Sequence, residues 1–264
     1  MRPIASILIL CALVPQIVFA AYAGTHSANL VSTSSQHFSR ADTATVSPTG
    51  NMTLEGWIRF TTKPTNSTRV WASKYISPNR SFNFYMGTDG GPGEYMALCI
   101  SSTGSDQSCV NTLTASSSLT WQTGVWYHVA AVFTAATPSV KFYVNGNLVS
   151  TETPSLSSIF DGTADLRIGR GSSTEYWNGD MALFRLWSTT RTATQLDDDR
   201  CSFLGTTTNL GGEWTLNNTT DDNSGNSNTL TNNNTATFAT NIPDDCPVTA
   251  VPPSDTSGNF FFVL

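Results

Sequence analysis

The chain has 264 residues, of which 39% are hydrophobic and 12% charged, and its formal net charge is −6. That length suffices for one large all-β domain or two small ones, and a charged share of roughly a quarter would be usual. Serine, threonine and asparagine make up the difference, which favours a neutral extracellular surface. Because the chain has only three lysines and no basic stripe, we do not expect a nucleic-acid or anionic membrane partner.

The N-terminus has the pattern of a secretory signal peptide. Arg2 supplies the positive end, residues 4–14 are apolar, and small-residue cleavage sites follow at 18–20 (Val-Phe-Ala) and 21–23 (Ala-Tyr-Ala). The apolar run is shorter than the ~20 residues that a membrane span needs. We therefore expect a secreted, extracellular protein without a membrane span, cleaved at one of the two sites.

The first strong strand signal after the leader covers residues 52–60. Apolar residues alternate strictly there with a second face that carries Glu55, Trp57 and Arg59. A period of two residues is that of a β-strand, so one face of this segment is expected to lie in a core.

The cysteines predict two structural disulfides. Loss of the leader removes Cys11 and leaves four of the five cysteines, which allow three pairings. Cys99 and Cys109 lie in two short apolar runs separated by Ser-Thr-Gly-Ser-Asp, and a hairpin would place them nearly opposite each other, within disulfide reach. Cys201 and Cys246 are then the remaining pair. No closely spaced Cys or His pairs suggest zinc.

The middle of the chain contains the clearest strands. Residues 126–133 are apolar on both faces apart from His128, as in an inner strand that is covered on both sides. With no second histidine nearby, we expect His128 to be a hydrogen-bonded sheet residue and not a ligand or base. Residues 140–149 predict a hairpin, since Asn145-Gly146 provides the two positive-φ positions of a type I′ turn.

Residues 166–169 and 181–187 predict two further strands. Residues 192–199, which begin with a threonine and are rich in acid, predict the only helical turn. Short strands at this spacing, separated by Gly, Pro, Asn and Ser, are typical of a two-sheet sandwich.

Five of these segments occur in the order found in a known family: residues 53–58, 126–133, 141–149, 166–169 and 177–187. The series resembles the laminin-G-like jelly-roll modules of the concanavalin A-like lectin/glucanase superfamily, with pentraxins as relatives, over roughly residues 28–243. The resemblance implies an all-β, two-sheet antiparallel jelly-roll sandwich. It leaves function open, because this fold hosts lectins, glycosidases and adhesion modules alike.

Residues 213–216 and those that follow resemble a segment that opens many such modules, but here it stands near the C-terminus. It either begins a truncated second module or supplies a strand to the one sandwich in permuted order. About 50 residues remain from that point, fewer than the ~100 of a sandwich, so we favour permutation. We expect a signal peptide at 1–23, one jelly-roll domain at 24–246 and a tail at 247–264.

The sequence lacks the paired carboxylates of the superfamily's glucanases, which resemble one another in a Glu-x-Asp-x-x-Glu strand. Retaining hydrolysis needs two carboxyl groups about 5–5.5 Å apart. None of the five glutamates has a carboxylate two positions along, and the acidic run at 197–199 fits a solvated turn. We therefore predict that the protein is not an enzyme and keep a glycoside hydrolase only as the least favoured alternative.

One loop is a candidate calcium site. Asp221, Asp222 and Asn226 lie in an oxygen-rich turn, which suits a hard cation that takes 6–8 oxygen ligands. The same residues also form good Asx turns without any metal, and only two carboxylates are local. The turn interpretation is the stronger one, and Ca²⁺ remains the only candidate cofactor.

Aromatic plates beside amides suggest where sugar could bind, because sugar C–H faces stack on rings. The candidates are Tyr176, Trp177 and Asn178 in one Gly-rich turn and Trp71 with Tyr75 in another segment; core or rim packing would also explain each of them. The resemblance implies a secreted, non-catalytic binding or adhesion module that recognises carbohydrate or a cell-surface glycoprotein. The alternative is a structural surface-layer or matrix sandwich without a small ligand.

Overall fold

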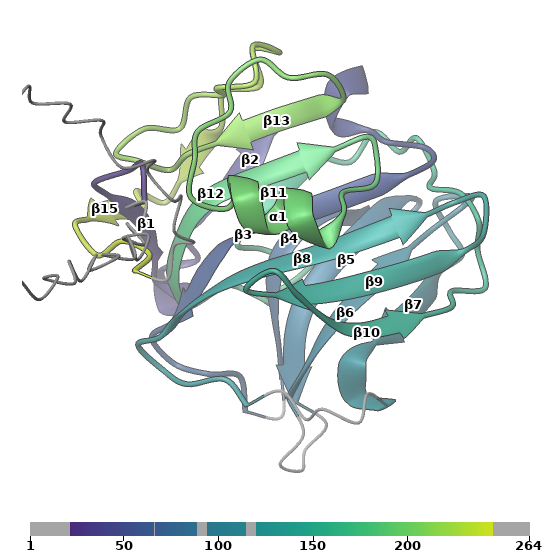
Figure 1. The fold of residues 1–264 in the computed structure, drawn as a ribbon, viewed down its shortest axis with the longest axis horizontal. Helices are drawn as coiled ribbons and strands as arrows, with labels where there is room; N and C mark the ends of the chain where they lie inside the picture. The colour runs from purple at the N-terminus through teal and green to yellow at the C-terminus, as the bar shows by residue number, and fades with distance from the viewer. Residues whose placement is uncertain (1–21, 66, 89–93, 115–119, 245–264) are drawn as a thin grey trace, which may run out of the picture.

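Two antiparallel sheets pack face to face in the computed structural model, which describes residues 22–244 except 66, 89–93 and 115–119 (Figure 1). The strands are β1 (Ser27–Leu30), β2 (His37–Arg40), β3 (Met52–Phe60), β4 (Thr68–Ile76), β5 (Asn79–Thr88), β6 (Glu94–Ile100), β7 (Ser108–Asn111), β8 (Trp126–Thr134), β9 (Ser139–Val144), β10 (Asn147–Glu152), β11 (Leu166–Ile168), β12 (Gly179–Trp187), β13 (Leu210–Trp214), β14 (Thr231–Asn233) and β15 (Thr237–Ala239). The helix α1 spans Ala193–Asp199, and 3₁₀ turns span Ser32–Ser34, Ala44–Val46 and Thr112–Thr114. None of the described helices is long and apolar enough to cross a membrane.

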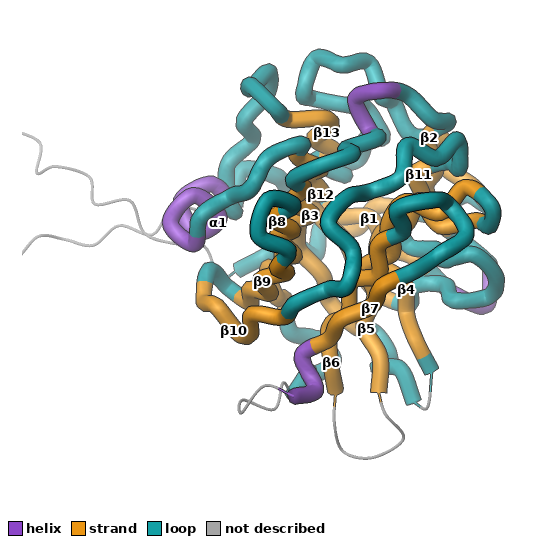
Figure 2. The backbone as a smooth tube through the Cα atoms, turned by 90° about the vertical axis from the view of Figure 1, so that its right-hand side faces the viewer, coloured by secondary structure: helices purple, strands orange, loops and turns teal. Residues whose placement is uncertain are grey.

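The two sheets have an antiparallel jelly-roll order. Sheet A runs β10-β9-β8-β3-β12-β1-β15, with β13 also paired to β12, and sheet B runs β14-β2-β11-β4-β5-β6-β7. Figure 2 shows α1 on the outer side of sheet A, away from sheet B. The predicted all-β, two-sheet sandwich is confirmed.

The core follows from the alternation in the strands. The apolar face of β3, which includes Leu54 and Ile58, packs into the main core between the sheets. Its other face is buried as well: Trp57 belongs to a second cluster on the outer side of sheet A. On the same outer side of sheet A, Leu196 of α1 packs against Ala130 of β8 in a third, smaller cluster. Strand β8 is therefore covered on both sides, as its composition predicts.

The short predicted elements are also present. Asn145 and Gly146 have φ angles of 48° and 75°, as a type I′ turn between β9 and β10 requires. Thr192 caps α1 through a capping box with Gln195, which explains why the helix begins there.

The segment after Leu210 belongs to this one sandwich. Strand β13 pairs with β12 in sheet A, β14 pairs with β2 in sheet B, and β15 pairs with β1. The last three strands therefore complete both sheets with partners from the first half of the fold and from β12.

The predicted hairpin disulfide is confirmed. Cys99 and Cys109 face each other in the β6–β7 register and are bonded. Cys201 is also disulfide-bonded. Its predicted partner, Cys246, lies outside the described residues, as do Cys11 and the leader up to residue 21, so that pairing stays a prediction.

Candidate functional site

A single row of side chains crosses all seven strands of sheet B on its outer face. Residues that pair directly across antiparallel strands share a face, and this row is one step out of phase with the core row that contains Phe38, Ile168 and Phe84. From β14 to β7 its members are Thr231, Ser39, Arg167, Ser73, Asn83, Cys99 and Cys109. This face is therefore polar, and it carries the disulfide at one end.

A hollow of about 350 Å³ lies over β4 to β7 on this face. Asn83, Val70 and the disulfide are among the residues that line it. The register places the pair Tyr75/Arg80 on one side of Ser73/Asn83 and the pair Val70/Tyr85 on the other. The hollow is thus flanked by a tyrosine at each end, with an amide between them.

Neighbouring side chains fix the positions of Tyr75 and Tyr85, the two tyrosines that flank the hollow. Tyr75 donates a hydrogen bond from its hydroxyl to Gln107 Oε1 at 2.8 Å, and the Arg80 guanidinium lies 5.3 Å from its ring centre. The Tyr85 ring meets Tyr95 edge to face at 6.2 Å. Burial raises the pKa of Tyr85 to about 12, so its hydroxyl stays neutral and able to donate.

The floor contains an unused acceptor. Asn83 Oδ1 is buried and has no hydrogen-bond partner within the described part of the chain. Such a group usually pairs with protein, water or ligand, because leaving it unpaired costs about 1–3 kcal/mol. Glu175, on the loop beside the hollow, accepts from the Ser173 amide at 3.0 Å and from its hydroxyl at 3.2 Å.

Three arginines near the hollow have no acidic partner. Among the described residues, Arg80, Arg167 and Arg170 form no ion pair, whereas cations elsewhere, such as Arg59 and Lys74, each pair with an aspartate. Burial lowers the pKa of Arg167, and the positive charge of Arg170 nearby lowers it further. These three guanidinium groups therefore have no direct carboxylate partner in the described chain, although Asp165 lies close enough to Arg167, and Asp106 to Tyr75, for their charges to act there.

The aromatic residues predicted to stack on sugar lie in different parts of the structure. Tyr75 forms a wall of the hollow, and Tyr176 is half-buried with Arg170 stacked 5.2 Å from its ring. Trp71 and Trp177 are 0% exposed and pack in the core, so the expectation that these two present a stacking face is corrected. Asn178 Oδ1 accepts from the Ser32 amide at 3.2 Å, a contact that holds a loop.

The predicted calcium loop is closed by its own hydrogen bonds. The Asp222 carboxylate accepts from the amides of Glu213, Ser224 and Asn228 at 2.9–3.0 Å. The Asn226 amide group donates to the Leu210 carbonyl at 2.7 Å.

Asp221 accepts from the Thr219 hydroxyl at 2.6 Å, again within the loop. No group of three or more His, Cys, Asp or Glu side chains in the described ranges is placed to hold a metal ion. Because these contacts are those of an Asx-rich turn, we leave calcium out of the proposed function.

A buried charge network lies under α1 on the outer side of sheet A. Arg185 Nε is 2.7 Å from Glu213 Oε2, and Arg185 also lies 3.7 Å from Glu55. His128 Nε2 is 3.4 Å from Glu55 Oε2, so this histidine lies beside a buried carboxylate within the sheet, and its predicted hydrogen bond stays a prediction. All four side chains are buried, and the network therefore supports the fold and is closed to substrate.

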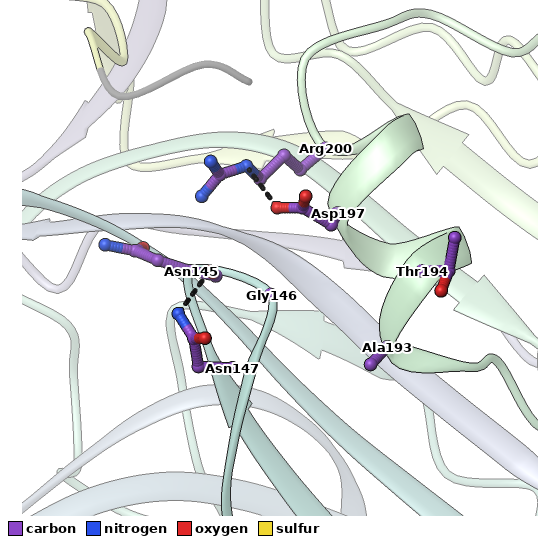
Figure 3. A pocket seen from close by; sticks show the side chains of 7 residues that line it. All are labelled: Asn145, Gly146, Asn147, Ala193, Thr194, Asp197 and Arg200. Atoms are coloured by element: carbon purple, nitrogen blue, oxygen red, sulfur yellow. Dashed lines mark hydrogen bonds and ion pairs between the residues drawn. The ribbon is translucent and has the colours of Figure 1, made fainter. Parts of the chain in front are cut away.

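A second hollow, of about 440 Å³, separates the β9–β10 turn from α1 (Figure 3). Asn145 and Asn147 lie on one side, and Asp197 and Arg200 pair at 3.3 Å on the other. No aromatic side chain lines it, so it lacks a stacking surface for sugar.

The order of strands in the two sheets defines the protein as a jelly-roll sandwich. A family model for the concanavalin A-like lectin/glucanases superfamily, in its laminin-G branch, matches residues 32–197. The match covers more than half of the chain, and the protein belongs to that family. No curated protein matches the sequence.

Two solved structures show the same fold. A candidate carbohydrate-binding protein from Bacteroides ovatus has 19% identity and a TM-score of 0.62, covering 86% of this chain and 62% of that one. A heptameric SAP-like pentraxin from Limulus polyphemus has 14% identity and a TM-score of 0.57, covering 87% of this chain and 95% of that one. This chain thus spans less than two thirds of the Bacteroides protein.

The residues that sequence reasoning missed are Asn83, Tyr85 and Arg167. Alternation within residues 79–88 places Asn83 and Tyr85 on one face, opposite Phe84, and could have identified them. Arg167 comes from a distant strand, and only the sheet order brings it into the same row.

Proposed function

We propose that the protein is a secreted, non-catalytic carbohydrate-binding module and that sugar binds in the hollow on the outer face of sheet B. The observation that carries the proposal is the placement of Tyr75 and Tyr85 on either side of Asn83, whose buried Oδ1 lacks a partner among the described residues. Sugar rings stack their C–H faces on tyrosine, and sugar hydroxyls donate to an amide oxygen. The superfamily name and the Bacteroides structure support the same class of ligand.

The charge of the face favours an acidic sugar. Arg80, Arg167 and Arg170 supply guanidinium groups without ion pairs in the described chain, and Glu175 is the one carboxylate among the residues that line the hollow. Guanidinium groups bind carboxylate and sulfate oxygens through paired hydrogen bonds. Carboxylated or sulfated oligosaccharides are the expected ligands.

The same residues support a non-catalytic role. Glycoside hydrolysis in most families needs two carboxyl groups that flank the scissile bond. Among the described residues that line the hollow, Glu175 is the only carboxylate, and its oxygens accept hydrogen bonds from Ser173. Secretion is supported by the signal-peptide pattern and by the disulfides, which persist in oxidising compartments.

A glycan array followed by calorimetry tests the proposal. We expect the protein to bind acidic oligosaccharides, and Tyr85→Ala to weaken that binding about tenfold or more, since buried aromatic contacts often contribute over 1 kcal/mol. Tyr85→Phe keeps the ring and removes only the hydroxyl, so it separates the contribution of the hydroxyl to binding from that of the ring. An array without signal, or Tyr85→Ala binding as tightly as the wild type, would refute the site and favour a structural sandwich.

A further inference from the structure

The first described residue is part of the folded body. Tyr22 is 5% exposed and belongs to the apolar cluster on the outer side of sheet A, together with Trp57, Leu183 and Cys201. Its ring meets Phe203 edge to face with 5.9 Å between centroids. Its hydroxyl donates to the Thr215 carbonyl at 3.4 Å.

The backbone after Tyr22 is anchored as well. The Ala23 amide donates to the Cys201 carbonyl at 2.9 Å. The Tyr22 ring lies so close over Gly24 that a Cβ there would come within 2.5 Å of it, which only glycine permits. The amides of the next two residues both donate to Asn217 Oδ1, at 2.9 and 2.8 Å, and lead directly into β1.

Tyr22 lies beside the buried charge network. Arg185 and Glu213 are both 0% exposed, and they lie close enough to Tyr22 to act on its hydroxyl. Burial raises the pKa of Tyr22, and the Arg185 charge opposes that rise.

The two cleavage sites that the sequence offers therefore give different products. Cleavage after Ala23 removes the Tyr22 ring, with its contact to Phe203, and the Ala23 amide that donates to the Cys201 carbonyl. Cleavage after Ala20 keeps Tyr22 and places the new ammonium on Ala21. The two products therefore differ in folded stability, and only the product of cleavage after Ala20 keeps the Tyr22 contacts that the structure shows.

We infer that the leader is hydrolysed at the Ala20–Ala21 peptide bond, so that the mature protein begins at Ala21 and not at Gly24, as a leader of residues 1–23 would give. One water molecule is consumed, Ala20 gains a carboxylate and Ala21 an ammonium group. The inference rests on the secretion proposed above and is independent of the sugar site on sheet B.

The test is the N-terminus of the secreted protein. The full chain with its leader is expressed in a secreting host, collected from the medium, and examined by N-terminal sequencing and intact mass. We expect Ala-Tyr-Ala-Gly as the first four residues. A start at Gly24 would overturn the inference, and a cell-bound chain that keeps its leader would overturn both the inference and secretion.

A second measurement compares chains made to start at Ala21 and at Gly24. The Gly24 chain is expected to melt on the order of 10 °C lower, or not to fold, because it lacks a buried aromatic ring. Tyr22→Ala in the Ala21 chain should reproduce most of that shift, whereas Tyr22→Phe should stay within a few degrees of the wild type. Equal melting of the two chains would overturn the inference. Sugar binding by either folded chain tests the sheet B proposal separately.

Discussion

Removal of Arg185 should be among the most destabilising single changes in the protein. Its guanidinium pairs with Glu213 at 2.7 Å and donates to the carbonyls of Asp199, at 3.1 Å, and Ser202. Deleting one partner of a buried pair costs about 3–5 kcal/mol, because the other charge stays buried and uncompensated. The amides of Leu204 and Gly205 still donate to Glu213 at 3.0 Å, so we expect Arg185→Met to cost about 3 kcal/mol.

Chemical denaturation and thermal melting at pH 7 measure this cost. A loss of about 3 kcal/mol corresponds to a melting temperature roughly 6–12 °C lower for a domain of this size. The double variant Arg185→Met with Glu213→Leu is the matched control, and it should recover part of the loss because no buried charge remains unpaired. A single variant within 0.5 kcal/mol of the wild type would show that the pair contributes no net stability and would refute the reasoning.

Three further predictions concern the sugar site, pH and the disulfide. Arg167→Gln should weaken the binding of an acidic oligosaccharide severalfold in calorimetry and make that affinity less dependent on salt concentration. The control is Lys141→Gln, which removes an exposed cation of sheet A without an ion pair and should change neither the affinity nor its salt dependence. Burial lowers the pKa of His128, so the protein should become less stable as the pH drops below the ordinary histidine pKa of 6.5. His128→Gln should therefore reduce the fall in melting temperature between pH 7 and pH 5, and an unchanged fall would contradict this. Serine in place of both cysteines of the sheet B disulfide, which closes a 10-residue separation, should cost about 2–3 kcal/mol in denaturation, and a neutral result would contradict the predicted constraint on the unfolded chain.

Local patterns predicted the local structure well. The Asn145-Gly146 turn and the cross-strand pair Cys99–Cys109 depend on a few neighbouring residues, and both are present. Strand β4 was not predicted, because a bulge between Val70 and Ala72 turns Trp71 into the core and interrupts the period of two.

Of the residues in the proposed sugar site, only Tyr75 was predicted from the sequence. Large tryptophan rings were the natural candidates from sequence, but in one sandwich such rings fill the core, as Trp71 and Trp177 do. Tyrosine, with its polar hydroxyl, lies at the rim of the hollow instead. Asn83 and Arg167 are 84 positions apart in the chain and share a row only through the order β11-β4-β5, which no local pattern contains.

The pairing of β1 with β15 and of β2 with β14 has a consequence for the order of events in the cell. Each pair joins residues about 200 positions apart, so neither sheet is complete until residues 231–239 have left the ribosome. Until then the central strands of both sheets expose apolar faces and unpaired edges. A chain of this topology can therefore finish folding only after β14 and β15 have been synthesised, and these two short strands control when the sandwich closes.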